Sequence, residues 1–135
     1  MQKNSNGFSL LELMITLTII GILTAFCLPL YSQHMIETHR LEAKIALEKL
    51  AATFENYFIE HNSYQGATLE ILKTPSLVSK NNYQLIIKKL SDNYFSIAAK
   101  PLAHQAAQDT ICATLTLDSL GKKEITGIGK LSDCW

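Results

Sequence analysis

The most prominent pattern in the chain is a long apolar segment that no charged side chain interrupts. Between Glu12 and Glu37 there is no Asp, Glu, Lys or Arg. This gap of about 24 residues exceeds the roughly 20 residues that an α-helix needs to cross a bilayer. The pattern therefore predicts one membrane-spanning helix near the N-terminus.

Beyond Pro29 the pattern becomes that of an amphipathic helix. Apolar residues recur at steps of three, four and seven and predict one buried stripe: Ile36, Ala43, Leu47, Leu50, Phe54 and Tyr57. Turn-forming residues after His61 predict that the helix ends near Asn62. From Phe8 to His61 such a helix would be about 80 Å long, because each residue adds about 1.5 Å. A small domain buries only its second half, so the first half must lie in lipid or against other subunits.

The C-terminal half predicts an antiparallel sheet. Residues 83–90 and 93–102 have mixed apolar patterns typical of strands, and residues 111–118 alternate apolar and polar as in a half-buried strand. A turn then leads to a short return strand at 124–126. About four strands packed on the exposed half of the long helix make an α+β fold. Residues 103–108 fit a short helix or a loop equally well.

Charge and cysteine content indicate which partners and which compartment to expect for the chain. The 135 residues have a formal net charge of 0, so no strong overall field points to nucleic acid. Lys3 precedes the apolar segment. Because basic flanking residues stay on the cytoplasmic side of a membrane, we expect the short leader to lie in the cytoplasm and the C-terminal half to be exported. Cys112 and Cys134 then lie in an oxidising compartment and are expected to form a disulfide, whereas Cys27 is read as a small apolar filler.

Glu12 does not fit the two simplest explanations of the apolar segment. A secretory signal peptide has a shorter apolar core and a small-residue cleavage site behind it. A plain membrane anchor gains nothing from a carboxylate, which costs roughly 2.5–3.5 kcal/mol inside a bilayer unless it has a partner. Glu12 must therefore have a function of its own.

The stretch Gly7-Phe8-Ser9-Leu10-Leu11-Glu12 resembles the hallmark of the type IV pilin family. The resemblance implies that a prepilin peptidase cuts between Gly7 and Phe8 and that Phe8 is then N-methylated. It also implies that Glu12 meets the N-terminal amine of a neighbouring subunit during assembly. Gly21 and Pro29 fall where such pilins carry helix-breaking residues. The C-terminal part, from Asp109 to Trp135, is similar to minor pilins of PilE type from type IVa systems.

This resemblance implies an organisation in four segments. They are a cleaved leader (1–7), a membrane-spanning or filament-core half of the helix (8–35), its amphipathic half (36–62), and a globular β-sheet head with a C-terminal disulfide loop (63–135). The expected location is the inner membrane, with the head in the periplasm, and then the extracellular filament. Expected partners are other pilin subunits, the prepilin peptidase, the inner-membrane assembly platform and membrane lipid.

The sequence contains no catalytic or metal-binding motif. The four histidines, His34, His39, His61 and His104, lack ligand spacing, and no phosphate loop, nucleophile elbow or carboxylate pair is present. We therefore expect neither an enzyme nor a cofactor.

The expected function is that of a minor pilin acting in pilus assembly, adhesion, twitching motility or DNA uptake. One alternative is a pseudopilin of a type II secretion system, which shares the N-terminal pattern. Another is a DNA-binding uptake pilin, whose basic surface would come from Lys88, Lys89, Lys122, Lys123 and Lys130. These lysines equally fit strand edges and turns that keep a sheet soluble.

Overall fold

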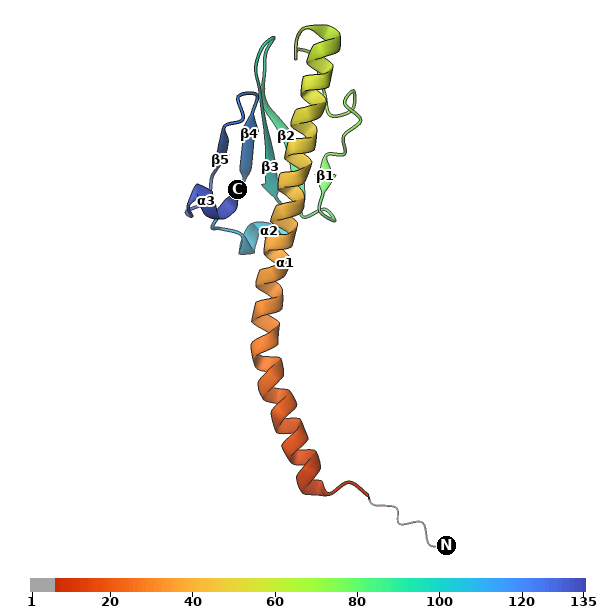
Figure 1. Cartoon of the computed structure of the whole chain (residues 1–135), viewed down its shortest axis with the longest axis vertical. Helices are drawn as coiled ribbons and strands as arrows, with labels where there is room; N and C mark the ends of the chain where they lie inside the picture. The colour runs from red at the N-terminus through yellow and green to blue at the C-terminus, as the bar shows by residue number, and fades with distance from the viewer. Residues whose placement is uncertain (1–6) are drawn as a thin grey trace, which may run out of the picture. The chain divides into compact units, whose positions relative to one another are not determined.

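The computed structural model describes residues 7–135, which form two compact units, one up to Met35 and one from Ile36 to Trp135. Helix α1 (Leu10–His61) supplies the first unit and continues as the first element of the second. Figure 1 labels the helices and strands in chain order. The predicted leader, apart from Gly7, lies outside the described residues.

The first unit consists of the apolar part of α1. Its large side chains are exposed, and the helix is long and apolar enough to cross a membrane by length and composition. The hydroxyls of Thr16, Thr18 and Thr24 each donate to the backbone carbonyl four residues earlier. These three polar groups are thus satisfied by the helix itself, which suits an apolar environment. The helix continues through Gly21 and Pro29, and a break there in a filament stays a prediction.

The second unit packs the rest of α1 on a five-stranded antiparallel sheet with strand order β1-β2-β3-β4-β5 (Figure 1). Two short helices connect the later strands and end the chain. The bounds are β1 Leu77–Val78, β2 Tyr83–Leu90, β3 Phe95–Pro101, α2 Ala103–Gln108, β4 Leu115–Asp118, β5 Lys123–Ile125 and α3 Leu131–Cys134. The predicted α+β pilin fold is confirmed.

The core of this unit lies where the apolar stripe of α1 meets the inner face of the sheet. Ala43, Leu47, Leu50 and Phe54 are buried at helical spacing. The ring of Phe54 stacks on that of Phe95 in β3, with centroids 4.6 Å apart. The stripe was predicted from sequence, although its outer members Ile36 and Tyr57 are only half-buried.

The predicted end of α1 is also confirmed. The helix stops at His61, and Asn62 has φ 56°, the left-handed conformation in which helices commonly end. The amide of Asn62 donates to the carbonyl of Phe58 at 2.7 Å, which satisfies one of the last free carbonyls of the helix.

The predicted strand over residues 111–118 is wrong in its first half. Only Leu115–Asp118 is β4, because Ala113 has φ 51° and reverses the alternation of side chains. As a result Cys112 is buried and Ile111 is 51% exposed, the opposite of the sequence pattern. The sheet also contains β1, which precedes the predicted strands, and residues 103–108 are helical.

Candidate functional site

The predicted processing and assembly residues lie at the start of the described chain. Phe8 is 79% exposed and precedes α1, and Glu12 lies in its first turn. A carboxylate is favoured there because the N-terminus of a helix carries a partial positive charge. Within residues 7–135 the Glu12 side chain has no ion pair, so it is available to a partner from outside.

The predicted disulfide joins Cys112 to Cys134, and both cysteines are buried. It closes a loop whose two sides are held together by backbone hydrogen bonds. Gly127 donates to the carbonyl of Cys112 at 3.1 Å, and Gly129 donates to that of Ile111 at 2.8 Å. A Cβ on Gly127 would lie 2.1 Å from the oxygen of Ile111, so this close approach requires glycine.

Three of the five predicted lysines lie around one cavity on the outer face of the sheet, the face away from α1. We call it the sheet cavity; its volume is about 310 Å³. The residues that line it come from β2 to β5 and their connections: Lys88, Lys89, Tyr94, Ser96, Thr116, Asp118, Lys122 and Glu124. Polar groups dominate this lining, and its cations come from two separate strand regions.

A bulge in β2 explains why two consecutive lysines reach the same cavity. Side chains in a regular strand alternate between the two faces of the sheet, so Lys88 and Lys89 would point to opposite sides. The pairing of β2 with β3 shifts its register between Ile87 and Lys89. The extra residue breaks the alternation, and both lysines are exposed and line the sheet cavity.

The acidic residues of the sheet cavity are already engaged. The Asp118 carboxylate accepts the backbone amides of Leu120 and Lys122, both at 2.9 Å, and thereby shapes the turn between β4 and β5. Glu124 pairs with Lys122 at 2.6 Å, and this hydrogen-bonded pair lowers the pKa of Glu124. Lys88 and Lys89 have no ion pair among the described residues, so they are the cavity's available cations.

The structure separates the other two lysines from the sheet cavity. Lys123 points to the α1 side, where its Nζ lies 3.3 Å from Glu48 and 4.7 Å from the ring centroid of Trp135. Lys130 precedes α3 as its N-cap residue and is exposed. The basic surface expected from five lysines is therefore reduced to three around one cavity.

Sequence reasoning missed a buried polar cluster that we call the Asp109 network: Arg40, Tyr83, Gln105 and Asp109. The side chain of Asp109 is fully buried and accepts two hydrogen bonds from the Arg40 guanidinium, at 2.7 and 3.0 Å. The hydroxyl of Tyr83 donates to it at 2.8 Å. Gln105 donates to the backbone carbonyl of Ile36 at 3.1 Å. The network thus joins α1, β2 and α2 next to Cys112 of the disulfide.

Electrostatics keep this network ionised. Burial by itself raises the pKa of Asp109, but the hydrogen bonds from Arg40 and Tyr83 outweigh it and hold that pKa below its usual range. Burial also raises the pKa of Tyr83, so its hydroxyl keeps its proton and remains a donor. The sequence drew attention to Asp109 only as the start of the segment that resembles minor pilins, and to Arg40 only as a charge in the amphipathic helix. Neither observation indicates that the two side chains pair across 69 positions. Within residues 7–135, no group of His, Cys, Asp and Glu is placed to hold a metal ion.

Comparisons with known proteins bear on both parts of the chain. Residues 2–28 match the family model described as the prokaryotic N-terminal methylation motif. Residues 29–116 match the model described as type IV minor pilin ComP, DNA uptake sequence receptor.

Individual relatives match over shorter stretches. The chain is 32% identical over 81 residues to the type IV major pilin protein PilA of Myxococcus xanthus, covering 60% of this chain and 37% of that protein. It is 34% identical over 87 residues to the type IV major alpha-pilin of Moraxella bovis, covering 63% and 50%. The chain therefore spans half or less of the length of these relatives.

A solved structure supports the fold. The non-core minor pilin PilV of Neisseria meningitidis matches with a TM-score of 0.59 at 20% identity, covering 72% of this chain and 92% of that one. At this level of identity the likeness concerns the fold alone.

Proposed function

The chain belongs to the family described as type IV minor pilin ComP, DNA uptake sequence receptor, and from this premise we propose that it is a pilus subunit that binds DNA through the sheet cavity. Pilins are structural proteins that associate with other pilin subunits, so the chain is not an enzyme.

At the N-terminus we propose the processing that the pilin motif implies. The prepilin peptidase cuts between Gly7 and Phe8, the new N-terminus is methylated, and the apolar part of α1 holds the subunit in the inner membrane with its head in the periplasm. Glu12 then docks on the N-terminal amine of a neighbouring subunit at the assembly platform. The methylation-motif match and the absence of any ion pair to Glu12 among the described residues support this sequence of events.

The observation that carries the DNA-binding proposal is the gathering of Lys88, Lys89 and Lys122 around the sheet cavity in a chain of this family. A DNA backbone presents phosphates in a row, and cations from separate strand regions on one face can contact successive phosphates. Tyr94 and the buried residues Ser96 and Thr116 also line this cavity, and the Tyr94 hydroxyl is engaged by Asp118.

A phosphate would have to compete with the acids of this cavity. Asp118 is held by backbone amides and by the hydroxyl of Tyr94, so it stays in place. Glu124 is exposed, and a phosphate approaching Lys122 would displace it. Lys88 and Lys89 are therefore expected to supply most of the affinity, and Lys122 to join only when its pair with Glu124 opens.

The test is a gel-shift titration of the full chain in detergent micelles with double-stranded DNA at several salt concentrations. Each phosphate contact contributes about 0.9 to the slope of log affinity against log salt, so removing both free lysines should reduce the slope by about 2. The variant K88Q/K89Q tests this, and K44Q is a matched control because Lys44 lies on α1, away from the sheet cavity. Binding that is absent at low salt, or unchanged in K88Q/K89Q, would refute the proposal.

A secretion pseudopilin remains the second candidate for the filament itself. The match of residues 29–116 to a minor pilin model and the C-terminal disulfide both favour the pilus. Detection of the chain in sheared surface filaments by mass spectrometry would decide between them, since a pseudopilus subunit would stay with the cell envelope.

A further inference from the structure

The sheet cavity has a floor of short side chains. The register pairs Ser96 of β3 with Asp118 of β4, and Ala98 of β3 with Thr116 of β4. Directly opposed residues of an antiparallel pair point to the same face of the sheet, so these four share the outer face. Ser96 and Thr116 are buried and line the cavity. The face is hollowed at this point because longer side chains surround these short ones.

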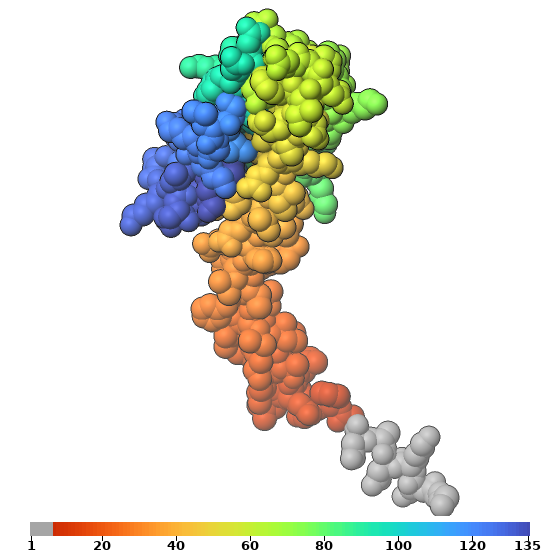
Figure 2. Space-filling view, turned by 45° about the horizontal axis from the view of Figure 1, so that its top comes forward, coloured from red at the N-terminus to blue at the C-terminus, as the bar shows by residue number. Residues whose placement is uncertain are grey.

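Cations stand on two sides of this floor. Lys88 and Lys89 belong to β2, whereas Lys122 directly precedes β5. The strand order places β3 and β4 between β2 and β5, so three strand spacings, about 14 Å, separate the main chains that carry these lysines. In Figure 2 the teal segment near residue 90 and the blue segment near residue 120 adjoin beside the helix. A nucleic acid strand that crosses the hollow can therefore place phosphates on both sides of it.

Tyr94 adds an aromatic ring to the same hollow. It directly precedes β3, and its hydroxyl donates to the Asp118 carboxylate of β4 at 3.3 Å, which holds the ring across the two central strands. The side chain is half-buried, and within residues 7–135 its ring has no aromatic partner. An aromatic ring beside cations is the combination with which proteins hold an unpaired nucleobase, because every base has a π-face to stack and a phosphate to neutralise.

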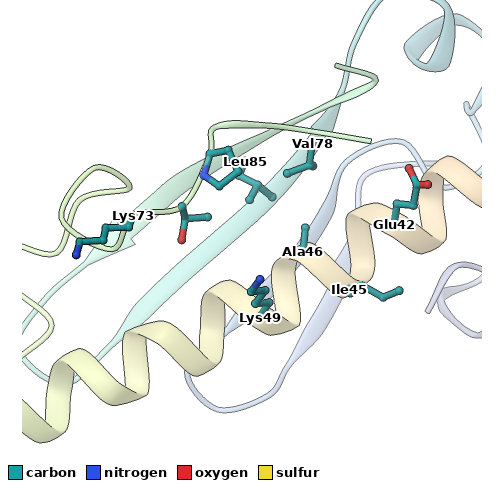
Figure 3. A pocket seen from close by; sticks show the side chains of 9 residues that line it. Glu42, Ile45, Ala46, Lys49, Lys73, Val78 and Leu85 are labelled. Atoms are coloured by element: carbon teal, nitrogen blue, oxygen red, sulfur yellow. The ribbon is translucent and has the colours of Figure 1, made fainter. Parts of the chain in front are cut away.

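Two other hollows among the described residues of the head lack this combination. The groove between α1 and the segment from Lys73 to Val78 has a volume of about 280 Å³ and a mostly apolar lining without an aromatic ring (Figure 3). The hollow at the end of α1, about 220 Å³, contains Tyr57, but the ring of Tyr57 stacks on that of His61 with centroids 4.0 Å apart. One face of the Tyr57 ring is therefore already covered, and the lining of this hollow includes a single lysine.

The size of the sheet cavity suits one base. Its volume of about 310 Å³ lies at the lower end of the range of about 300–1,000 Å³ that is usual for ligand pockets. In duplex DNA each base is paired and stacked inside the helix, so it can enter such a hollow only after extrusion, which costs free energy. The bases of a single strand have no partner strand to leave. A duplex is therefore expected to contact the lysines alone, whereas a single strand can use the lysines and the ring.

We propose that the sheet cavity is a binding site for one unpaired nucleobase, with Tyr94 as the stacking surface and the lysines on both sides as phosphate contacts. The inference rests on the DNA-binding function proposed above, and it names single-stranded DNA as the ligand class that the site prefers. The lysines supply the part of the affinity that depends on salt, and Tyr94 supplies the part that distinguishes a single strand from a duplex.

Fluorescence anisotropy of the full chain in detergent micelles tests the inference. The measurement is made near physiological salt, where phosphate contacts contribute less than at low salt. The probes are a labelled oligo(dT) of about 12 nucleotides, within the usual site size of about 4–16, and a mixed-sequence duplex of the same length. Oligo(dT) should bind more tightly than the duplex. Tyr94→Leu should weaken oligo(dT) binding about fivefold or more, the lower limit for loss of one base–aromatic stack, and should leave duplex binding unchanged.

Two further variants separate stacking from a structural effect. Tyr94→Phe loses the hydrogen bond to Asp118 but keeps the ring, so it should retain most of the preference for oligo(dT). Tyr57→Leu is the matched control, because Tyr57 is also a half-buried tyrosine but lies on α1 outside the sheet cavity. It should leave both affinities unchanged. Unchanged fluorescence of Trp135 in the absence of DNA will confirm that each variant folds.

The outcomes distinguish this inference from the function on which it rests. Binding of neither probe would refute both. Duplex binding that depends on Lys88 and Lys89 and equals or exceeds oligo(dT) binding would overturn the inference alone. Unchanged oligo(dT) binding in Tyr94→Leu, or an equal loss for both probes, would do the same. Full competition by free thymidine monophosphate at the same concentration of nucleotide would also overturn it, because the ligand would then be a free nucleotide and not a DNA strand.

Discussion

The Asp109 network predicts a large and specific loss of stability when its charge is removed. In D109N the Arg40 guanidinium, whose side chain is only 13% exposed, remains in place without its counter-charge. Breaking a buried ion pair from one side typically costs about 3–5 kcal/mol, because the remaining charge stays desolvated. Y83F removes one hydrogen bond to the same carboxylate and should cost about 1–3 kcal/mol.

The Asp109 network also predicts the direction in which the stability of the chain changes with pH. The pKa of Asp109 in the folded chain lies below its ordinary value, so the unfolded chain binds the proton first as the pH falls. The stabilisation is therefore fully present above the unfolded value of about 3.9 and is lost as the pH falls through the folded value. D109N should lack this acid-dependent component, whereas D133N, which changes an exposed acid, should retain it.

The assay is denaturant unfolding of the full chain in detergent, followed by fluorescence. Trp135 is the only tryptophan, and its indole nitrogen donates to the carbonyl of Glu124 at 3.2 Å, so its emission reports the packing of the C-terminal loop. R40Q should cost about as much as D109N, and the double variant should cost clearly less than the sum of the two. A loss below about 1 kcal/mol in D109N, or full additivity, would refute the coupling.

Three further outcomes are expected. Glu12→Ala should leave the protein cleaved and membrane-bound but poorly incorporated into filaments. The measurement is the amount of the subunit in sheared pili relative to the amount in membranes, and normal incorporation would contradict the docking role. Gly127→Ala should destabilise the disulfide loop by about 1–3 kcal/mol through overpacking against the Ile111 carbonyl, measured by Trp135 fluorescence during unfolding, and an unchanged midpoint would argue against the close packing. Glu124→Gln should release Lys122 and raise DNA affinity in the gel shift, and a weaker complex would show that the carboxylate itself takes part in binding.

Local pattern was sufficient for the elements that repeat a simple period. The absence of charge between Glu12 and Glu37 identified the apolar half of α1, and the spacing from Ala43 to Phe54 identified the buried face of its other half. These predictions succeeded because a helix of this length can bury only one stripe, and the residues of that stripe recur along the sequence at helical spacing. The cysteine pair followed from its compartment and its even number, and the structure confirms it.

What the sequence by itself determined is therefore the long helix with its apolar and amphipathic halves, the disulfide and the α+β class. Tertiary structure alone decided where the head's polar groups meet. Three features depend on strand register and on contacts between distant segments. They are the bulge that turns Lys88 and Lys89 to one face, the left-handed Ala113 that keeps the predicted strand from starting before Leu115, and the pairing of Arg40 with Asp109. Such contacts carry no local signature, because their free energy appears only when the strands have paired and water has been excluded from between them.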